Sequence, residues 1–125
     1  KLESLIDKKL KLLNLKLGDL FMVGFSQGTM VSIQYAIGQQ KEIAGVLGYS
    51  GKIFNYDLFN KQLKSKPKIK FLHGNIDEIV PVEEMYKAVD FLKTKKFNVD
   101  FRVYDNLKHA ISPAGLSDGL NFIKK

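Results

Sequence analysis

A serine between two glycines is the residue of this chain best suited to covalent chemistry. Ser26 is the centre of the pentapeptide Gly24-Phe25-Ser26-Gln27-Gly28, which follows an apolar run and precedes a helix-like segment. A sharp turn from a strand into a helix holds a serine hydroxyl above a sheet and leaves little room two residues before and after it. The pattern predicts a nucleophile elbow in which Gly24 and Gly28 give that room and the Gln27 N–H stabilises an oxyanion. The alternative is a glycine-rich turn with an inert serine.

An acid and a base follow the serine in the order that such a site requires, each on a loop after a later strand. The segment 68–74 has the pattern of a short strand, and Asp77 lies on the loop after it. The segment 99–104 alternates apolar and polar residues as a strand does, and His109 lies five residues beyond it. We predict that His109 takes the Ser26 proton and that Asp77 fixes the His109 tautomer, while Ser26 attacks an acyl carbon.

Three other residues compete for these roles. His73 stands at the end of a strand, where a hydrogen bond to the loop backbone is better supported than catalysis. Glu78 fits a solvated loop position, and Asp105 fits a turn-forming residue at the end of a strand. Neither carboxylate displaces Asp77. The chain has no cysteine and no closely spaced histidine pair, so we expect neither a metal nor another cofactor.

Three motif blocks resemble the phospholipase/carboxylesterase family of α/β-hydrolases, which also contains acyl-protein thioesterases. The blocks are the elbow 24–28, the acid loop 73–81 (His-Gly-Asn-Ile-Asp-Glu-Ile-Val-Pro) and the segment 108–112 (Lys-His-Ala-Ile-Ser). The resemblance implies Ser26, Asp77 and His109 as a catalytic triad. Lys108 stands where the family commonly has glycine, which questions the geometry of that loop.

The activity implied by the resemblance is cleavage of carboxylic esters of small or lipid-like acyl substrates through an acyl-enzyme. An acyl-protein thioesterase is an open alternative, because the pocket walls that set ester preference and acyl length belong to an N-terminal half with no counterpart here. A catalytically incomplete fragment that acts as a non-enzymatic module is a further alternative. Four apolar residues are expected to contact the substrate, with core or loop packing as their alternative role: Phe54, Ile79, Val80 and Ile111.

Alternating strand and helix patterns predict an α/β fold with about four parallel strands. We expect strands at 20–24, 43–48, 68–73 and 99–104, ordered as they occur, helices at 2–16, 27–40, 82–96 and 113–124, and a short helix within 52–65. The 125 residues form a single domain with a modest core. The resemblance implies that this domain is the C-terminal part of an α/β-hydrolase, without the N-terminal strands and the oxyanion loop.

The loss of those strands would place the elbow strand at the edge of the sheet. We therefore expect poor solubility, a homodimer formed through that edge, or dependence on a missing N-terminal segment. The oxyanion hole would keep the Gln27 N–H and lose its second donor, which costs roughly 10²–10³ in turnover. An intact triad with weak or no activity in this chain alone is the expected result.

The charge pattern argues against nucleic acid as a partner. Twenty Lys and Arg against thirteen Asp and Glu give a net charge of +7, but Arg102 is the only arginine and the lysines are scattered. Nucleic-acid binding favours arginine and exposed aromatic residues in one stripe, whereas a basic surface attracts anionic lipid or acidic substrates. No stretch reaches the roughly 18 apolar residues of a membrane span, and no signal-peptide pattern opens the chain. The lack of cysteine fits a reducing compartment, and we expect a cytoplasmic location.

Overall fold

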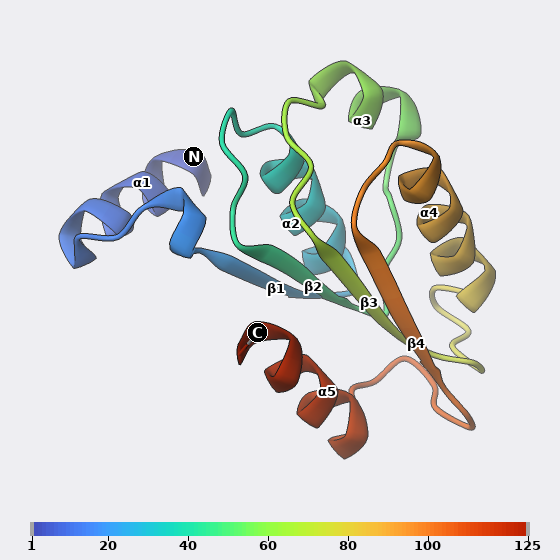
Figure 1. Cartoon of the computed structure of the whole chain (residues 1–125). Helices are drawn as coiled ribbons and strands as arrows, with labels where there is room; N and C mark the ends of the chain where they lie inside the picture. Colours follow the sequence, from blue (N-terminus) through green and yellow to red (C-terminus); the bar gives the residue numbers. More distant parts are fainter. Residues whose placement is uncertain (1, 125) are drawn as a thin grey trace.

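The sheet contains four parallel strands in chain order, as the sequence predicts. The computed structural model describes residues 2–124; Lys1 and Lys125, which the predicted single domain includes, lie outside the described residues. The strands are β1 (Phe21–Phe25), β2 (Gly45–Tyr49), β3 (Ile69–Gly74) and β4 (Val99–Tyr104). Each strand pairs in parallel with the next, and Figure 1 shows them side by side from β1 to β4. The carboxyl ends of all four strands therefore lie at the same end of the sheet, where the loops with the candidate residues begin.

Helices cover both faces of this sheet. Within the described residues they are α1 (Leu2–Leu13), α2 (Gln27–Ile37), α3 (Tyr56–Gln62), α4 (Val82–Thr94) and α5 (Pro113–Lys124), with a short 3₁₀ turn η1 (Leu17–Asp19) before β1. The helices α2, α3 and α4 lie on one face, and α5 lies on the opposite face (Figure 1). Parallel strands joined by helices in this way bury apolar residues on both sides of the sheet.

The larger core lies between the sheet and the helices α2, α3 and α4. It includes fully buried residues from each of these elements, among them Ile33, Ile37, Val46, Phe59, Ile69, Phe71, Met85 and Leu92. The smaller core under α5 depends on a close approach of that helix to β2. A Cβ at Gly119 would lie 2.1 Å from the Tyr49 Oη, and this hydroxyl donates to the Gly115 carbonyl oxygen at 2.9 Å.

The predicted ends of three helices are wrong by two or three residues, because local capping ends each helix earlier. The helix α1 stops at Leu13, since Asn14 takes a left-handed φ of 56° and the Leu15 N–H bonds back to the Leu10 carbonyl oxygen, as in a Schellman cap. The helix α2 ends before Gly38. The helix α4 ends at Thr94, shortly before a left-handed Lys96.

The strand β1 lies at one edge of the sheet, as predicted. Among the described residues it pairs with β2 alone. Val23 and Phe25 of this strand are 55% and 39% exposed. The helix α1, which lies beyond this edge in Figure 1, contains no buried residue. Apolar side chains therefore face solvent along this side of the described molecule.

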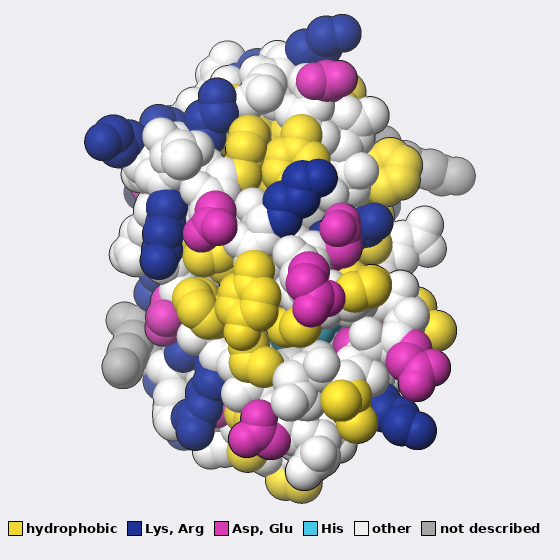
Figure 2. Space-filling model, turned by 90° about the vertical axis from the view of Figure 1, so that its right-hand side faces the viewer, with side chains coloured by type: hydrophobic (Ala, Val, Ile, Leu, Met, Phe, Trp, Pro, Cys, Tyr) yellow, Lys and Arg dark blue, Asp and Glu magenta, His cyan; other side chains and the backbone are white. Residues whose placement is uncertain are grey.

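Charges of both signs share the surface on the face shown in Figure 2. Lysine and arginine side chains are interspersed there with acidic ones, and apolar side chains gather between them. This face therefore carries a mixed charge pattern rather than one basic stripe. None of the helices in residues 2–124 is both long enough and apolar enough to cross a membrane.

Candidate active site

The turn between β1 and α2 holds Ser26 in a strained backbone conformation. Its φ is 55° and its ψ is −116°, a combination that a residue with a side chain rarely adopts. The Ser26 N–H donates to the Tyr49 carbonyl oxygen at 2.8 Å, which ties the turn to the end of β2. This is the strand-to-helix geometry that the pentapeptide predicts.

The two glycines of the pentapeptide differ in how much they are needed. A Cβ at Gly24 would lie 2.4 Å from the Thr29 backbone nitrogen, so the predicted crowding before the serine is confirmed. At Gly28 an added Cβ would meet nothing within 4 Å among the described residues. The predicted steric need at Gly28 is wrong there, because this residue already lies in the first turn of α2 and faces open space.

Gln27 is the first residue of α2 and is exposed. The N–H groups in the first turn of a helix have no acceptor within the helix, and the helix dipole is positive at this end. The Gln27 N–H is therefore available to donate to an anion that forms beside Ser26.

The carboxylate of Asp77 is buried in the loop after β3. Its Oδ1 accepts hydrogen bonds from the Ile79 N–H and the Val80 N–H, each at 2.9 Å, and its Oδ2 lies 2.8 Å from the His109 Nδ1. Burial alone would raise the pKa of this carboxyl, but the bonds from His109 and the two backbone N–H groups outweigh burial and lower the pKa below its ordinary value. Asp77 is therefore ionised near neutral pH and acts as an acceptor.

The imidazole of His109 joins Asp77 to Ser26. Its Nε2 lies 3.0 Å from the Ser26 Oγ, and its Nδ1 makes the 2.8 Å contact with Asp77. A carboxylate only accepts hydrogen bonds, so Nδ1 carries the proton and Nε2 of the neutral ring is left as the acceptor for the serine hydroxyl. The structure thus brings together three residues that are 83 and 32 positions apart, in a geometry that can move a proton from Ser26 to His109.

The acid loop and the histidine loop pack directly against each other. A Cβ at Gly74 would lie 2.1 Å from the Leu107 carbonyl oxygen and 2.6 Å from that of Lys108. The Ile76 N–H donates to the Leu107 carbonyl oxygen at 3.1 Å. Among the described residues a positive φ is confined to five residues other than glycine, and Lys108 is not one of them. The backbone therefore accommodates lysine at the position that the resemblance questions.

The competing residues take other roles. The His73 Nε2 lies 2.7 Å from the Val80 carbonyl oxygen, which confirms the predicted hydrogen bond to the loop backbone. Glu78 is exposed, and Asp105 accepts from the Asn75 side chain at 3.3 Å. Within residues 2–124, no group of three or more His, Asp and Glu is placed to hold a metal ion.

Phe25 contacts His109, a contact that the sequence pattern does not predict. Its ring centroid lies 4.8 Å from that of His109, with the two planes tilted by 50°. The sequence feature that could have indicated this contact is a large apolar residue inside an otherwise small and polar turn. The Phe25 ring therefore packs against the imidazole of the candidate base.

The four residues predicted to contact a substrate differ in exposure. Phe54, Ile79 and Ile111 are 72%, 70% and 43% exposed, whereas Val80 is only 5% exposed. Phe54 also lines a pocket of about 510 Å³ beside the elbow, together with Gln27, Met30, Val31, Gln34, Lys52 and Leu58. This pocket adjoins the Gln27 end of α2, next to Ser26 in the sequence.

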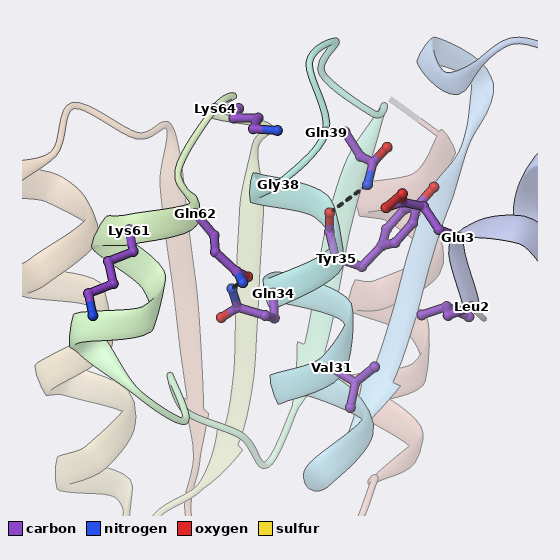
Figure 3. Close-up of a pocket in the computed structure, with 10 residues that line it drawn as sticks. All are labelled: Leu2, Glu3, Val31, Gln34, Tyr35, Gly38, Gln39, Lys61, Gln62 and Lys64. Atoms are coloured by element: carbon purple, nitrogen blue, oxygen red, sulfur yellow. Dashed lines mark hydrogen bonds between the residues drawn. The ribbon is translucent and has the colours of Figure 1, made fainter.

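A larger pocket lies at the other end of α2. It has a volume of about 660 Å³, lies between α1, α2 and α3 (Figure 3), and shares Val31 and Gln34 with the pocket beside the elbow. The Gln34 and Gln62 side chains bond to each other at 2.5 Å on its wall, and Gln39 donates to the Tyr35 carbonyl oxygen. Ser26, Asp77 and His109 do not line it. Pocket size therefore does not identify the site.

We expect the stability of the chain in acid to depend on Asp77. Its folded pKa lies below the ordinary value of 3.8, so the ionised carboxylate stabilises the fold above that value, and the stabilisation is lost as the pH falls through the folded pKa. Below about pH 4, the free energy of unfolding of the wild type should therefore fall more steeply than that of Asp77→Asn. Urea unfolding over a pH series measures this, and an equally steep fall in both chains would contradict it.

Comparisons with known proteins agree on one family. The model of the phospholipase/carboxylesterase family matches residues 1–125. Acyl-protein thioesterase 1 of Saccharomyces cerevisiae is 32% identical over 108 residues, covering 82% of this chain and 47% of that protein. A protein of Oryza sativa subsp. japonica named as a probable inactive carboxylesterase is 29% identical over 97 residues, covering 74% of this chain and 39% of that protein.

Solved structures show the same fold. The crystal structure of esterase PE8 matches with a TM-score of 0.94 and 24% identity, covering 98% of this chain and 57% of that one. SOBER1 of Arabidopsis thaliana matches with a TM-score of 0.88 and 26% identity, covering 97% of this chain and 59% of that one. The chain spans less than two thirds of the length of each of these relatives. Because the family model matches residues 1–125, this chain belongs to the phospholipase/carboxylesterase family of α/β-hydrolases.

Proposed function

We propose that this chain carries the catalytic triad of a serine hydrolase that cleaves carboxylic esters of small or lipid-like acyl groups. The observation that carries the proposal is the hydrogen-bonded series from Ser26 Oγ to His109 Nε2 and from His109 Nδ1 to Asp77 Oδ2. Family membership supports it, because serine esterases and thioesterases share this chemistry.

The reaction would proceed in two halves. Ser26 Oγ attacks the acyl carbon as its proton passes to His109 Nε2, and Asp77 stabilises the imidazolium that forms. The tetrahedral intermediate collapses, the leaving alkoxide takes the proton from His109, and the acyl group stays on Ser26. A water molecule then gives its proton to His109 and attacks the same carbon, which releases the carboxylic acid and restores Ser26.

The oxyanion of both intermediates needs donors that are already in place. The Gln27 N–H is one such donor, because it stands in the first turn of α2 beside the nucleophile. We propose that the second donor comes from the part of the family fold that this chain does not span, together with a further strand beside β1. The exposed Val23 and Phe25 of β1 support that arrangement, and so does the coverage of only 57% of esterase PE8.

Phe54, Ile79 and Ile111 are proposed to contact the acyl or alcohol group of the substrate. All three are exposed near loops that follow the carboxyl ends of the strands. Val80 is buried, so its proposed contribution is the backbone that holds the acid. The pocket beside Phe54 has room for a short acyl chain.

Acyl-protein thioesters are the second candidate substrates. Several relatives carry the name acyl-protein thioesterase 1, including those of Saccharomyces cerevisiae and Yarrowia lipolytica. The same triad attacks an ester or a thioester carbonyl, so the preference depends on the pocket and the leaving group. Turnover of matched p-nitrophenyl and S-acyl substrates of equal acyl length would separate the two candidates.

We expect a fluorophosphonate reagent to modify Ser26 and no other serine. The Oγ–phosphorus bond forms as fluoride leaves and His109 takes the proton, so the reaction requires the activated serine but no turnover. Intact-protein and peptide mass spectrometry locate the adduct. Ser26→Ala should abolish it, whereas Ser117→Ala, an exposed serine on α5, should leave it unchanged. A folded wild type without any adduct would instead support the non-enzymatic module.

A further inference from the structure

His73 is a buried titratable residue that the proposed chemistry does not use. It lies on β3, its side chain has no solvent exposure, and the side chain of Asp77 four residues later has none either. Its Nε2 is 2.7 Å from the Val80 carbonyl oxygen. A carbonyl oxygen only accepts, so the His73 Nε2 carries a proton and donates it to Val80.

The Val80 backbone links His73 to Asp77. The Val80 N–H donates to Asp77 Oδ1 at 2.9 Å, and the Val80 carbonyl oxygen accepts from His73. Val80 is therefore held at both ends, by Asp77 on one side and by His73 on the other. A shift of the Val80 backbone would move a donor that fixes one carboxylate oxygen of Asp77.

His73 also lies beside the other carboxylate oxygen. Its Nε2 is 3.5 Å from Asp77 Oδ2, the same atom that lies 2.8 Å from the His109 Nδ1. At 3.5 Å this contact is electrostatic rather than a full hydrogen bond. The His73 N–H that donates to the Val80 carbonyl oxygen therefore also lies beside Asp77 Oδ2.

We propose that His73 is a positioning residue that sets the orientation of the Asp77 carboxylate and, through it, the tautomer of His109. The inference rests on the proposed function for its effect on rate, but the positioning itself is a property of the folded chain. Packing alone does not account for this histidine. Its Nδ1 is buried with no hydrogen-bond partner among the described residues, a cost that an apolar side chain in the same space would avoid.

The direct test is the proton resonance of the His109 Nδ1–H, which lies at low field when it is bonded to a carboxylate. Asp77→Asn and His109→Gln assign it by removing it. His73→Leu, which lacks the donor, should shift or broaden this resonance, and His73→Gln, which keeps an N–H donor, should restore it in part. Ile69→Val on the same strand is the matched control, since it removes a buried methylene without touching the acid loop, and it should leave the resonance unchanged.

The rate of Ser26 modification by the fluorophosphonate gives the second measurement. A misplaced base costs up to about 10²-fold, so we expect His73→Leu to slow the reaction by between about 10-fold and 10²-fold and to shift its pH midpoint. A structural role alone would lower stability without moving that midpoint. Unfolding in urea places each variant on a common stability scale, so that loss of fold and loss of positioning are separated.

An unchanged resonance and an unchanged pH midpoint in a folded His73→Leu chain would overturn the inference. If this variant does not fold, His73→Asn replaces it, because its shorter amide falls short of the Val80 carbonyl oxygen; an unchanged resonance there has the same meaning. The two proposals fail separately. If the wild type is not modified by the fluorophosphonate but His73→Leu shifts the His109 Nδ1–H resonance, the proposed esterase is contradicted. If the wild type is modified normally and His73→Leu leaves that resonance unchanged, the positioning role is contradicted.

Discussion

Asp77→Asn is expected to slow the reaction of Ser26 by about 10⁴-fold, the loss typical of this change in a serine triad, while the chain stays folded. The reason lies in the two backbone donors. The Ile79 and Val80 N–H groups both point at Oδ1, so they hold the amide oxygen of an asparagine at that position. The amide NH₂ must then face the His109 Nδ1. That nitrogen becomes an acceptor, and the proton moves to Nε2, where it faces Ser26 and blocks general-base catalysis.

The rate of fluorophosphonate modification measures this effect even if turnover by the chain is slow. Asp105→Asn is the matched control, because Asp105 is an exposed carboxylate on the loop that leads to His109. It should change the rate by less than about threefold, as expected for a surface change away from the site. A loss of less than tenfold in Asp77→Asn, or an equal loss in Asp105→Asn, would show that Asp77 does not set the tautomer.

The sequence predicts the order of strands and the placement of the candidate residues because each signal is local. The elbow depends on the crowding at Gly24, which comes from Thr29 five residues later. The acid and the base lie on loops after recognisable strands, and parallel strands bring such loops to one edge of the sheet. No long-range contact had to be known to place Ser26, Asp77 and His109 near one another.

The features that the sequence does not reveal depend on contacts between distant segments. Gly74 has an ordinary place at the end of a strand, and its need for a bare Cα appears only when the Leu107 backbone lies 2.1 Å from the position of a Cβ. The contact of Phe25 with His109 joins residues 84 positions apart. The approach of the His73 Nε2 to within 3.5 Å of Asp77 Oδ2 requires the folded acid loop. Periodicity carries no information about any of these contacts.

The misplaced helix ends and the expected room at Gly28 have a different origin. A hydrophobic pattern continues past a cap, whereas a left-handed residue such as Asn14 stops the helix whatever follows. At Gly28 the expectation comes from the crowding of the strand-to-helix turn, which the structure shows at Gly24 but not at Gly28. In the described residues Gly28 lies in the first turn of α2, and a Cβ there would face open space.

The edge strand β1 leads to the prediction with the second largest effect. We expect a fusion that supplies the proposed further strand and donor loop, taken from the part of esterase PE8 that this chain does not cover, to raise ester turnover by about 10²–10³-fold, since this is the usual effect of one oxyanion donor. Turnover of p-nitrophenyl butyrate by the fusion and by the chain alone measures it.

The fusion with Ser26→Ala should be inactive, and a fusion with proline at the donor residue should lose the gain in turnover, because proline has no N–H. A folded fusion whose added strand protects the β1 amides from hydrogen exchange, yet whose turnover stays the same, would show that the second donor comes from elsewhere. If the chain alone dimerises through β1 and turns over the ester as fast as the fusion does, the second oxyanion donor comes from the second copy.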